Sequence, residues 1–300
     1  MVVREVDPAE VSSLYARLSG ACSEANGEGA LAAVEALSEA GAAPRFASLK
    51  SSLRRRGCSL RDLKMAGIKQ PESIGTPEER DDQGFLTTVL LVCSVIAVAA
   101  GFLPGDWGFF VPYLVGGVVL VVLAVGSTAP GLLYAVVDNV TGAAQRAGEG
   151  PGGERTLKHE AGHFLVCYML GTPAVGYSLD MGEEHTDLAE ASLGRPLGLK
   201  LLDDAEIDRL AVISMAGVAA EGLSFDEVKG GVGDLFTLQR LMGRARNGLK
   251  AEQQQSLTRW AVGEAAKIIR REPAAYESLQ KAMAAGESVA DCVKAIEAAR

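Results

Sequence analysis

The 300-residue chain has few of the residues on which several protein classes depend. It has five cysteines and no C-x-x-C spacing, which argues against a disulfide framework or a cysteine zinc ribbon. No G-x-x-x-x-G-K-[ST] sequence occurs, so we expect no P-loop and no ATP binding. Acidic residues outnumber basic ones by 38 to 29, and the resulting net charge of -9 argues against a nucleic-acid partner.

Charged residues are also missing from two long segments, residues 85–103 and 109–137. Each uncharged segment is long enough to cross the hydrocarbon core of a bilayer as a helix. The short sequence "PGDWG" lies between the two segments and is typical of a tight turn. We therefore expect a transmembrane hairpin over residues 85–137, with the lipid bilayer as a partner. The alternative is a pair of buried core helices in a soluble domain.

Basic residues predict the orientation of this hairpin. A hairpin returns the chain to the side from which it started, so both flanks lie on one side of the membrane. Lysines and arginines stand in both flanks, whereas the turn has the single charged residue Asp106. The positive-inside rule then places both soluble parts in the cytoplasm, or in a stroma or matrix.

The rest of the chain is predicted to be mainly helical. Apolar residues at spacings of three and four predict a small helical region over residues 1–70. Residues 71–84 form a polar linker and residues 138–156 a Gly-rich linker. In the longest soluble region, residues 157–300, short apolar pieces at 172–200 predict a small strand region. One helix is expected over "DDAEIDRLAVISMAGVAAEGLS", capped by Asp203 or Asp204.

Histidine is scarce, with three in the chain, and two of them stand in "HEAGH". On a helix, His159 and His163 are one turn apart and face the same side, which suits two ligands of one zinc ion. Glu160 is offset from them and can reach a water at the metal. A bound zinc lowers the pKa of such a water and polarises a peptide carbonyl, while the carboxylate takes the proton. The alternative is two surface histidines beside an ordinary glutamate.

Spacing alone leaves the third ligand open. The extended pattern H-E-x-x-H-x-x-G-x-x-H is excluded, because Val166 and Met169 stand at its last two conserved positions. The remaining histidine, His185, lies in a polar stretch and is typical of an exposed loop residue. Carboxylates that could complete the site are Glu183, Glu184, Glu190, Glu221 and Asp234.

The sequence "HEAGH" followed by "SMAGVAAEGLSFDEVKGGVGDLFTLQRLM" resembles the peptidase domain of the FtsH family of membrane-anchored zinc proteases. The resemblance covers about residues 157–300 and implies a helical zinc peptidase domain with a small strand region. It implies one Zn²⁺ per chain, bound by His159, His163 and Asp234, with Glu160 as the catalytic base. It also places Glu221 near the site, where a role in orienting the histidines fits, as does a capping or surface role.

The chain departs from that family in one large respect. FtsH proteins carry an ATPase module between the membrane and the peptidase, whereas here a short linker stands in that place. The layout resembles the ATPase-less relatives in plastids and cyanobacteria. We therefore expect a zinc metalloendopeptidase that cuts unfolded or membrane proteins, as a homo-oligomer or in association with FtsH-type complexes. The expected location is the plastid thylakoid membrane, or alternatively a bacterial inner membrane.

Two other functions are compatible with the sequence. The first is a non-proteolytic membrane scaffold, or an assembly or regulatory factor, that keeps the metal for structure. The second is a soluble, all-helical binding module. The intact H-E-x-x-H favours the enzyme over the scaffold, because a structural metal site does not need Glu160.

Overall fold

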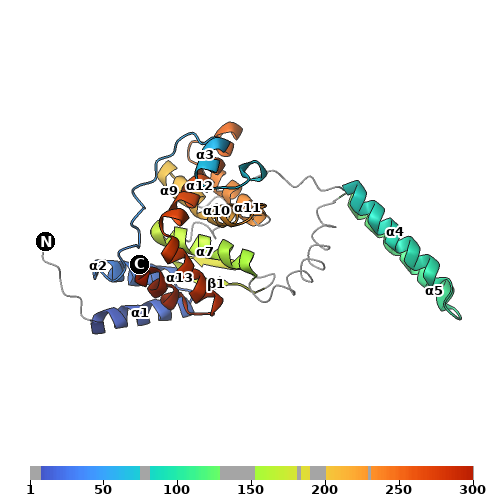
Figure 1. The fold of residues 1–300 in the computed structure, drawn as a ribbon, viewed down its shortest axis with the longest axis horizontal. Helices are drawn as coiled ribbons and strands as arrows, with labels where there is room; N and C mark the ends of the chain where they lie inside the picture. Colours follow the sequence, from blue (N-terminus) through green and yellow to red (C-terminus); the bar gives the residue numbers. More distant parts are fainter. Residues whose placement is uncertain are drawn as a thin grey trace. The chain divides into compact units, whose positions relative to one another are not determined.

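The computed structural model describes residues 8–74, 82–128, 153–180, 184–189, 201–228 and 231–299. These residues are mainly helical, as the sequence predicts. The chain divides into two compact units (Figure 1). Unit 1 comprises Met1–Thr76 together with Pro151–Arg300, and unit 2 comprises Pro77–Gly150. Unit 2, which contains the predicted transmembrane hairpin, is thus inserted in the sequence between the two parts of unit 1.

Unit 2 contains two helices that pack side by side (Figure 1), α4 (Asp82–Ala100) and α5 (Trp107–Thr128). Both overlap the predicted ranges, although residues 129–137 lie outside the described part of the chain. Among the described residues, one helix is long and apolar enough to cross a membrane, through its 18 residues Trp107–Ala124. The apolar part of α4, Thr87–Ala100, is shorter.

The apolar side chains of unit 2 are not packed into a core. None of Trp107–Ala124 is buried, which distinguishes α5 from the core helix of a soluble domain. Phe109 and Tyr113 are 81% and 76% exposed. On α4, Val98 and Leu91 are likewise exposed. Exposed apolar surface of this extent is typical of sites that contact a membrane or another protein.

Unit 1 is built from helices and one small sheet. Its N-terminal part has α1 (Pro8–Ser23), α2 (Gly27–Glu39), α3 (Leu60–Met65) and the 3₁₀-helix η1 (Pro71–Ser73). Its C-terminal part contains α7 (Glu154–Met169), β1 (Ala174–Ser178), β2 (His185–Leu188), α9 (Asp204–Ser214), α10 (Ala216–Ser224), α11 (Val232–Met242), α12 (Ala251–Arg271), α13 (Pro273–Ala284) and α14 (Val289–Ala298).

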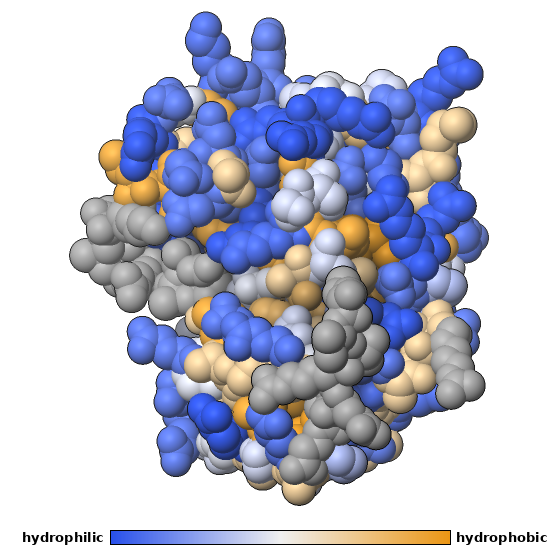
Figure 2. Space-filling model, turned by 90° about the vertical axis from the view of Figure 1, so that its left-hand side faces the viewer, coloured by the Kyte–Doolittle hydropathy of each residue, from blue (hydrophilic) through white to orange (hydrophobic). Residues whose placement is uncertain are grey.

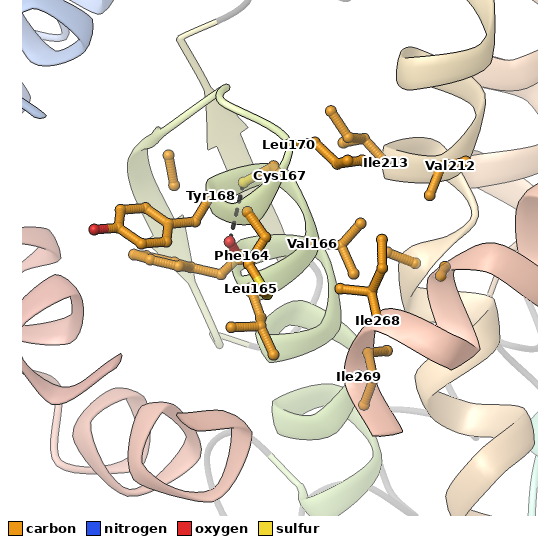
Figure 3. Packing of buried hydrophobic residues seen from close by; sticks show 14 of the residues in the cluster. Phe164, Leu165, Val166, Cys167, Tyr168, Leu170, Val212, Ile213, Ile268 and Ile269 are labelled. Atoms are coloured by element: carbon orange, nitrogen blue, oxygen red, sulfur yellow. Dashed lines mark hydrogen bonds between the residues drawn. The ribbon is translucent and has the colours of Figure 1, made fainter. Parts of the chain in front are cut away.

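The helix α7 lies at the centre of unit 1. It contacts α9, α10, α12 and α13, and both strands. Figure 3 shows its side chains pointing to several sides, with Val166 among Val212, Ile213 and Ile268 from neighbouring helices. From Phe164 onward every residue of α7 is buried. This burial explains why the second half of α7 is apolar all round instead of amphipathic.

The N-terminal helices share this core with the rest of unit 1. Leu18 and Leu37 are fully buried in the same cluster as Phe164. The chain after α2 is also bonded to the end of α7, since the amides of Ala47 and Leu49 donate to the carbonyls of Tyr168 and Met169. The predicted boundaries of the N-terminal region and linkers stay predictions, but residues 8–74 contribute to the fold that holds α7.

The prediction of one helix over residues 203–224 is wrong. Two helices, α9 and α10, meet at Met215, which has φ -95° and ψ 7° and ends the first of them. The predicted start is confirmed at Asp203, whose side chain accepts from the Glu206 amide in a capping box. The break was not visible in the sequence, because the apolar pattern continues across it. Close to this break, the carbonyl oxygen of Ile213 lies 2.9 Å from Nδ1 of His163 on α7.

The predicted strand region is a two-stranded antiparallel sheet of β1 and β2, in which Tyr177 pairs with Thr186. Residues 181–183 and 190–200 of the predicted strand region lie outside the described residues. The outer surface of unit 1 differs from that of unit 2. On the face in Figure 2, hydrophilic side chains predominate and hydrophobic ones are interspersed among them. Such a surface is typical of a unit that faces water.

Candidate metal centre

Two small residues allow α10 to lie close against the histidine-bearing turn of α7. A Cβ on Gly162 would lie 2.7 Å from Cβ of Ala220 and 2.9 Å from the carbonyl oxygen of Ala216. A Cβ on Gly217 would overlap the imidazole of His159. A side chain at Gly162 would force α7 and α10 apart, so glycine allows their close packing. The His159 ring occupies the space that a side chain at Gly217 would take.

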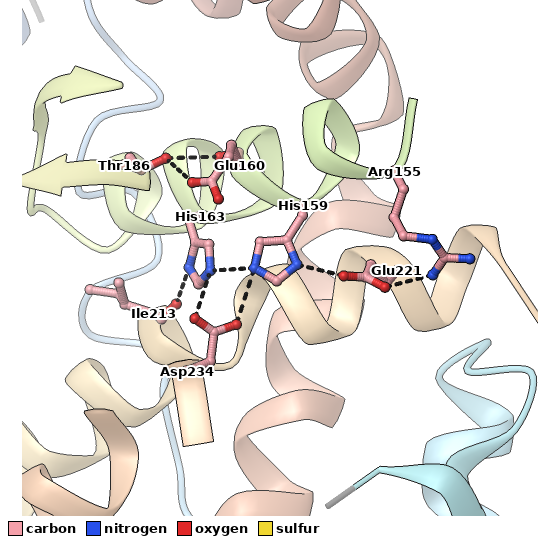
Figure 4. Close-up of polar contacts among 8 residues, drawn as sticks. All are labelled: Arg155, His159, Glu160, His163, Thr186, Ile213, Glu221 and Asp234. Atoms are coloured by element: carbon pink, nitrogen blue, oxygen red, sulfur yellow. Dashed lines mark hydrogen bonds and ion pairs between the residues drawn. The ribbon is translucent and has the colours of Figure 1, made fainter. Parts of the chain in front are cut away.

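Each histidine is oriented through its Nδ1 atom (Figure 4). Nδ1 of His163 lies 2.9 Å from the carbonyl oxygen of Ile213, and Nδ1 of His159 lies 2.8 Å from Oε1 of Glu221. A carbonyl oxygen or a carboxylate only accepts, so both Nδ1 atoms carry the hydrogen. In the neutral imidazoles the lone pairs are therefore on the two Nε2 atoms, which lie 3.2 Å apart.

Asp234 approaches the same point from the first turn of α11. The preceding Gly231 has φ 100°, a left-handed conformation that favours glycine, and it begins the turn into this helix. The Asp234 carboxylate places Oδ2 3.2 Å from Nε2 of His159 and Oδ1 3.3 Å from Nε2 of His163. One ligand atom from each of these three residues lies within 4.8 Å of the other two.

The convergence of these atoms fits a metal cation. Two imidazole lone pairs and a carboxylate point at one another, and they repel unless a proton or a cation lies between them. Among the described residues, Oδ2 of Asp234 is buried and accepts no hydrogen bond, and Nε2 of His159 lies 3.2 Å from it. A buried carboxylate oxygen of this kind requires an ion or another partner. Two neutral imidazoles and one carboxylate are ligands that zinc prefers, and three protein ligands leave a position open.

The same geometry perturbs the proton affinities when no metal is bound. Burial disfavours the charged form of His159, but contacts with Asp234 and Glu221 outweigh it and raise its pKa to about 10. The pKa of His163 is also raised, because the charge of Asp234 outweighs burial. Conversely, His163 and His159 lower the pKa of Asp234 well below its usual range despite burial. Protons and a metal cation therefore compete for one group of atoms.

Glu160 lies beside the two histidines but belongs to another hydrogen-bonded pair. Its side chain is buried, and its Oε2 atom accepts a hydrogen bond of 2.7 Å from Oγ1 of Thr186 on β2. Figure 4 shows this pair on the side of α7 away from Glu221. The carboxylate is thus held by one oxygen at a fixed place next to the two histidines.

Glu221 is among the most buried charged groups of the molecule, with 1% of its side chain exposed. One oxygen faces His159, and the other accepts a hydrogen bond of 2.6 Å from Nη1 of Arg155. Of the two roles compatible with the sequence, the structure supports orientation of a histidine ligand. A carboxylate behind a ligating histidine fixes its tautomer and increases its basicity.

The other candidate ligands lie elsewhere. Among the described residues, His159, His163 and Asp234 form the one group that could hold a metal. His185 is half exposed on β2, with Nε2 3.3 Å from Oδ2 of Asp187. Glu184 is outside the group, and Glu183 and Glu190 lie outside the described residues.

Sequence reasoning missed three residues of the site, Arg155, Thr186 and Gly217. Arg155 stands one helical turn before His159, and this i, i+4 spacing was a usable signal. Thr186 reaches Glu160 through the pairing of β1 and β2, for which the sequence gave no local signal. Gly217 is needed because of the close approach of two helices, which requires the three-dimensional fold.

No family model matches the chain, and neither a curated protein nor a solved structure matches it. The motif, the resemblance that it carries and the geometry of this site are therefore the grounds for inferring a function.

Proposed function

We propose that this protein is a membrane-anchored zinc metalloendopeptidase of the FtsH type without an ATPase module of its own. One observation carries the proposal. The Nε2 atoms of His159 and His163 and the carboxylate of Asp234 converge within 4.8 Å, with both Nδ1 atoms already engaged. The residue that the FtsH resemblance selects as third ligand is the one that meets the histidines, which supports both the resemblance and the metal.

Each residue of the site has a distinct task in this proposal. His159, His163 and Asp234 would hold one Zn²⁺, which supplies a Lewis acid for a peptide carbonyl and lowers the pKa of a water. Glu160 would accept a proton from the attacking water on its carboxylate and deliver it to the amine that leaves when the peptide C–N bond breaks. Thr186 keeps one Glu160 oxygen engaged, so the other is available for the proton. Glu221 and the Ile213 carbonyl fix the two imidazoles.

The membrane anchor in the proposal is a hairpin in which both α4 and α5 cross the bilayer. Its support is the insertion of unit 2 between the two parts of unit 1. Because residues before α4 and after α5 share one hydrophobic core, they must lie on one side of any membrane. A single crossing by α5 would separate them. The positive-inside rule then favours the stromal or cytoplasmic side, in a thylakoid or a bacterial inner membrane.

The proposed substrates are unfolded proteins or flexible segments of membrane proteins. A protease needs an unfoldase to act on folded chains, and the sequence has no P-loop with which to drive one. Association with FtsH-type complexes would supply that activity, whereas a homo-oligomer of this chain would act on unfolded segments alone.

The experiment is cleavage of casein, an unfolded substrate, by the detergent-purified full chain. We expect cleavage that a chelator stops and zinc restores, and a loss of about 10²-fold or more in Glu160→Gln, as for removal of a general base. The matched control is Glu154→Gln, which removes an exposed carboxylate from the same helix and should not change the rate. Activity that survives the chelator or Glu160→Gln contradicts the proposal. Full zinc loading without cleavage would favour the non-proteolytic scaffold.

A further inference from the structure

Arg155 lies in the first turn of α7, one helical turn before His159, and it contacts the same carboxylate as that histidine. Its Nη1 atom donates to Oε2 of Glu221 at 2.6 Å, while Oε1 of the same carboxylate faces Nδ1 of His159 at 2.8 Å (Figure 4). The three side chains form a line from the outer edge of the site to the metal ligand.

Three contacts fix the guanidinium in this place. Besides Glu221, Nη1 donates to the carbonyl oxygen of Glu227 at 2.7 Å. The guanidinium carbon lies 4.1 Å from the centre of the Phe225 ring, within the range of a cation–π contact. Arg155 therefore joins the start of α7 to the end of α10 and to the loop that follows it.

The Glu221 carboxylate needs such a partner. It is buried, and a buried carboxylate without compensation is costly. Arg155 holds Oε2 at 2.6 Å, and Oε1 of the same carboxylate then faces Nδ1 of His159 at 2.8 Å. The ring is then held with Nε2 toward His163 and Asp234.

We propose that Arg155 is a positioning residue of the metal site, which acts through Glu221 to hold His159 in its ligating orientation. This inference rests on the proposed zinc site but not on peptidase activity. Arg155 is one of the basic residues that flank the predicted hairpin, and the inference gives it a second role in zinc retention. A side chain that bonds to a metal ligand contributes to metal affinity although it does not touch the metal.

The test measures the rate at which the purified full-length protein, loaded with zinc, loses the ion to a chromophoric chelator. We expect Arg155→Gln to lose zinc about 10 to 100 times faster than the wild type, the usual effect of removing a partner behind a ligand. Arg155→Lys should fall between them, because lysine keeps the charge but not the planar fork. It also serves if Arg155→Gln does not fold.

Lys158→Gln is the matched control. Lys158 is in the same turn of α7, lies over the same Phe225 ring and pairs with Glu154. The variant should lose zinc at the wild-type rate. An effect equal to that of Arg155→Gln would mean that loss of either positive charge near Phe225, and not loss of the contact with Glu221, weakens the site, and would overturn the proposal.

A double variant separates positioning through Glu221 from a general structural effect. If Arg155 acts through Glu221, then Arg155→Gln combined with Glu221→Gln loses zinc no faster than Glu221→Gln alone. The proposal is overturned if the two substitutions multiply each other's effect on the rate of zinc loss. It is also overturned if Arg155→Gln loses zinc at the wild-type rate. A wild-type protein that takes up no zinc overturns the metal site itself. If Arg155→Gln lost casein cleavage but released zinc at the wild-type rate, this inference would be contradicted and the proposed function would stand.

Discussion

Nε2 of His163 lies 3.3 Å from Oδ1 of Asp234, although the two residues belong to different helices, α7 and α11. This contact closes a site that the H-E-x-x-H motif supplies only in part. It depends on the close packing of α7 against α10 and on the turn at Gly231 that begins α11. The following predictions test these dependencies.

Gly217→Ala should weaken metal binding although alanine favours helix formation. Alanine at a helix position normally stabilises by up to about 1 kcal/mol relative to glycine. Here its Cβ would overlap the His159 imidazole, so the ring or the helix must move. We expect zinc affinity to fall by more than about tenfold. Isothermal titration measures it, and Gly20→Ala, which has open space at its Cβ in α1, is the control. Equal affinity in Gly217→Ala would show that the close approach is unnecessary.

The stability of the metal-free protein should fall as the pH rises above neutrality. The pKa of His159 is raised from 6.5 to about 10, so the folded state holds this proton more tightly than the unfolded chain. Its contribution to stability is complete below about pH 6.5 and is lost as the pH approaches 10. The lowered pKa of Asp234 acts oppositely, contributing above its ordinary value near 3.8 and failing as the pH falls below it.

Thermal unfolding in a chelator between pH 4 and pH 10 checks this expectation. The melting temperature should be highest between about pH 4 and 6.5 and should decline toward pH 10. Saturating zinc should remove the decline, because the metal binds the deprotonated imidazoles. His185→Asn, which changes a half-exposed histidine, should keep the wild-type profile. Metal-free stability that rises between pH 7 and pH 10 would show that His159 is not held as its contacts indicate.

The N-terminal helices should unfold together with the rest of unit 1. Leu37 is fully buried on α2 in the core that includes α7, so Leu37→Ala should lower the free energy of unfolding by about 2–5 kcal/mol. Leu201→Ala, at a position that is 57% exposed, should have a small effect. Urea unfolding monitored at the buried Trp260 of α12 measures both. A separate early transition that leaves the Trp260 signal unchanged would mean that the N-terminal helices form an independent domain.

Both ends of the chain should lie on the same side of the membrane. This follows from the insertion of unit 2 into unit 1. Epitope tags at the two termini should be digested together, or protected together, when sealed vesicles are treated with protease. A cysteine placed at Gly105, in the turn between α4 and α5, should react with an impermeant maleimide from the opposite side. Termini on opposite sides would exclude the hairpin.

The sequence predicted the parts of this site that depend on local periodicity. His159 and His163 share a helix face because of their i, i+4 spacing, and α7 forms where the motif requires a helix. Asp234 could not be derived in this way, since its contact with the histidines depends on how α11 packs. Only the FtsH resemblance selected it among several carboxylates.

Features that arise from packing were predicted less well. The break at Met215 was missed because the apolar pattern runs through it, yet it places the Ile213 carbonyl at His163. The sharing of one core by residues at both ends of the chain was also missed, since helical periodicity says which face is buried but not against what.

Metal analysis of the wild type beside Asp234→Ala tests the central claim most directly. After dialysis, the full-length wild type should hold about one zinc per chain, and Asp234→Ala should retain little of it. Asp226→Ala is the control, because it removes an exposed carboxylate shortly before α11 that pairs with Lys69. It should keep the wild-type zinc content. Zinc content that is unchanged in Asp234→Ala would contradict the account, because the third ligand would then not be the one that the structure brings to His159 and His163.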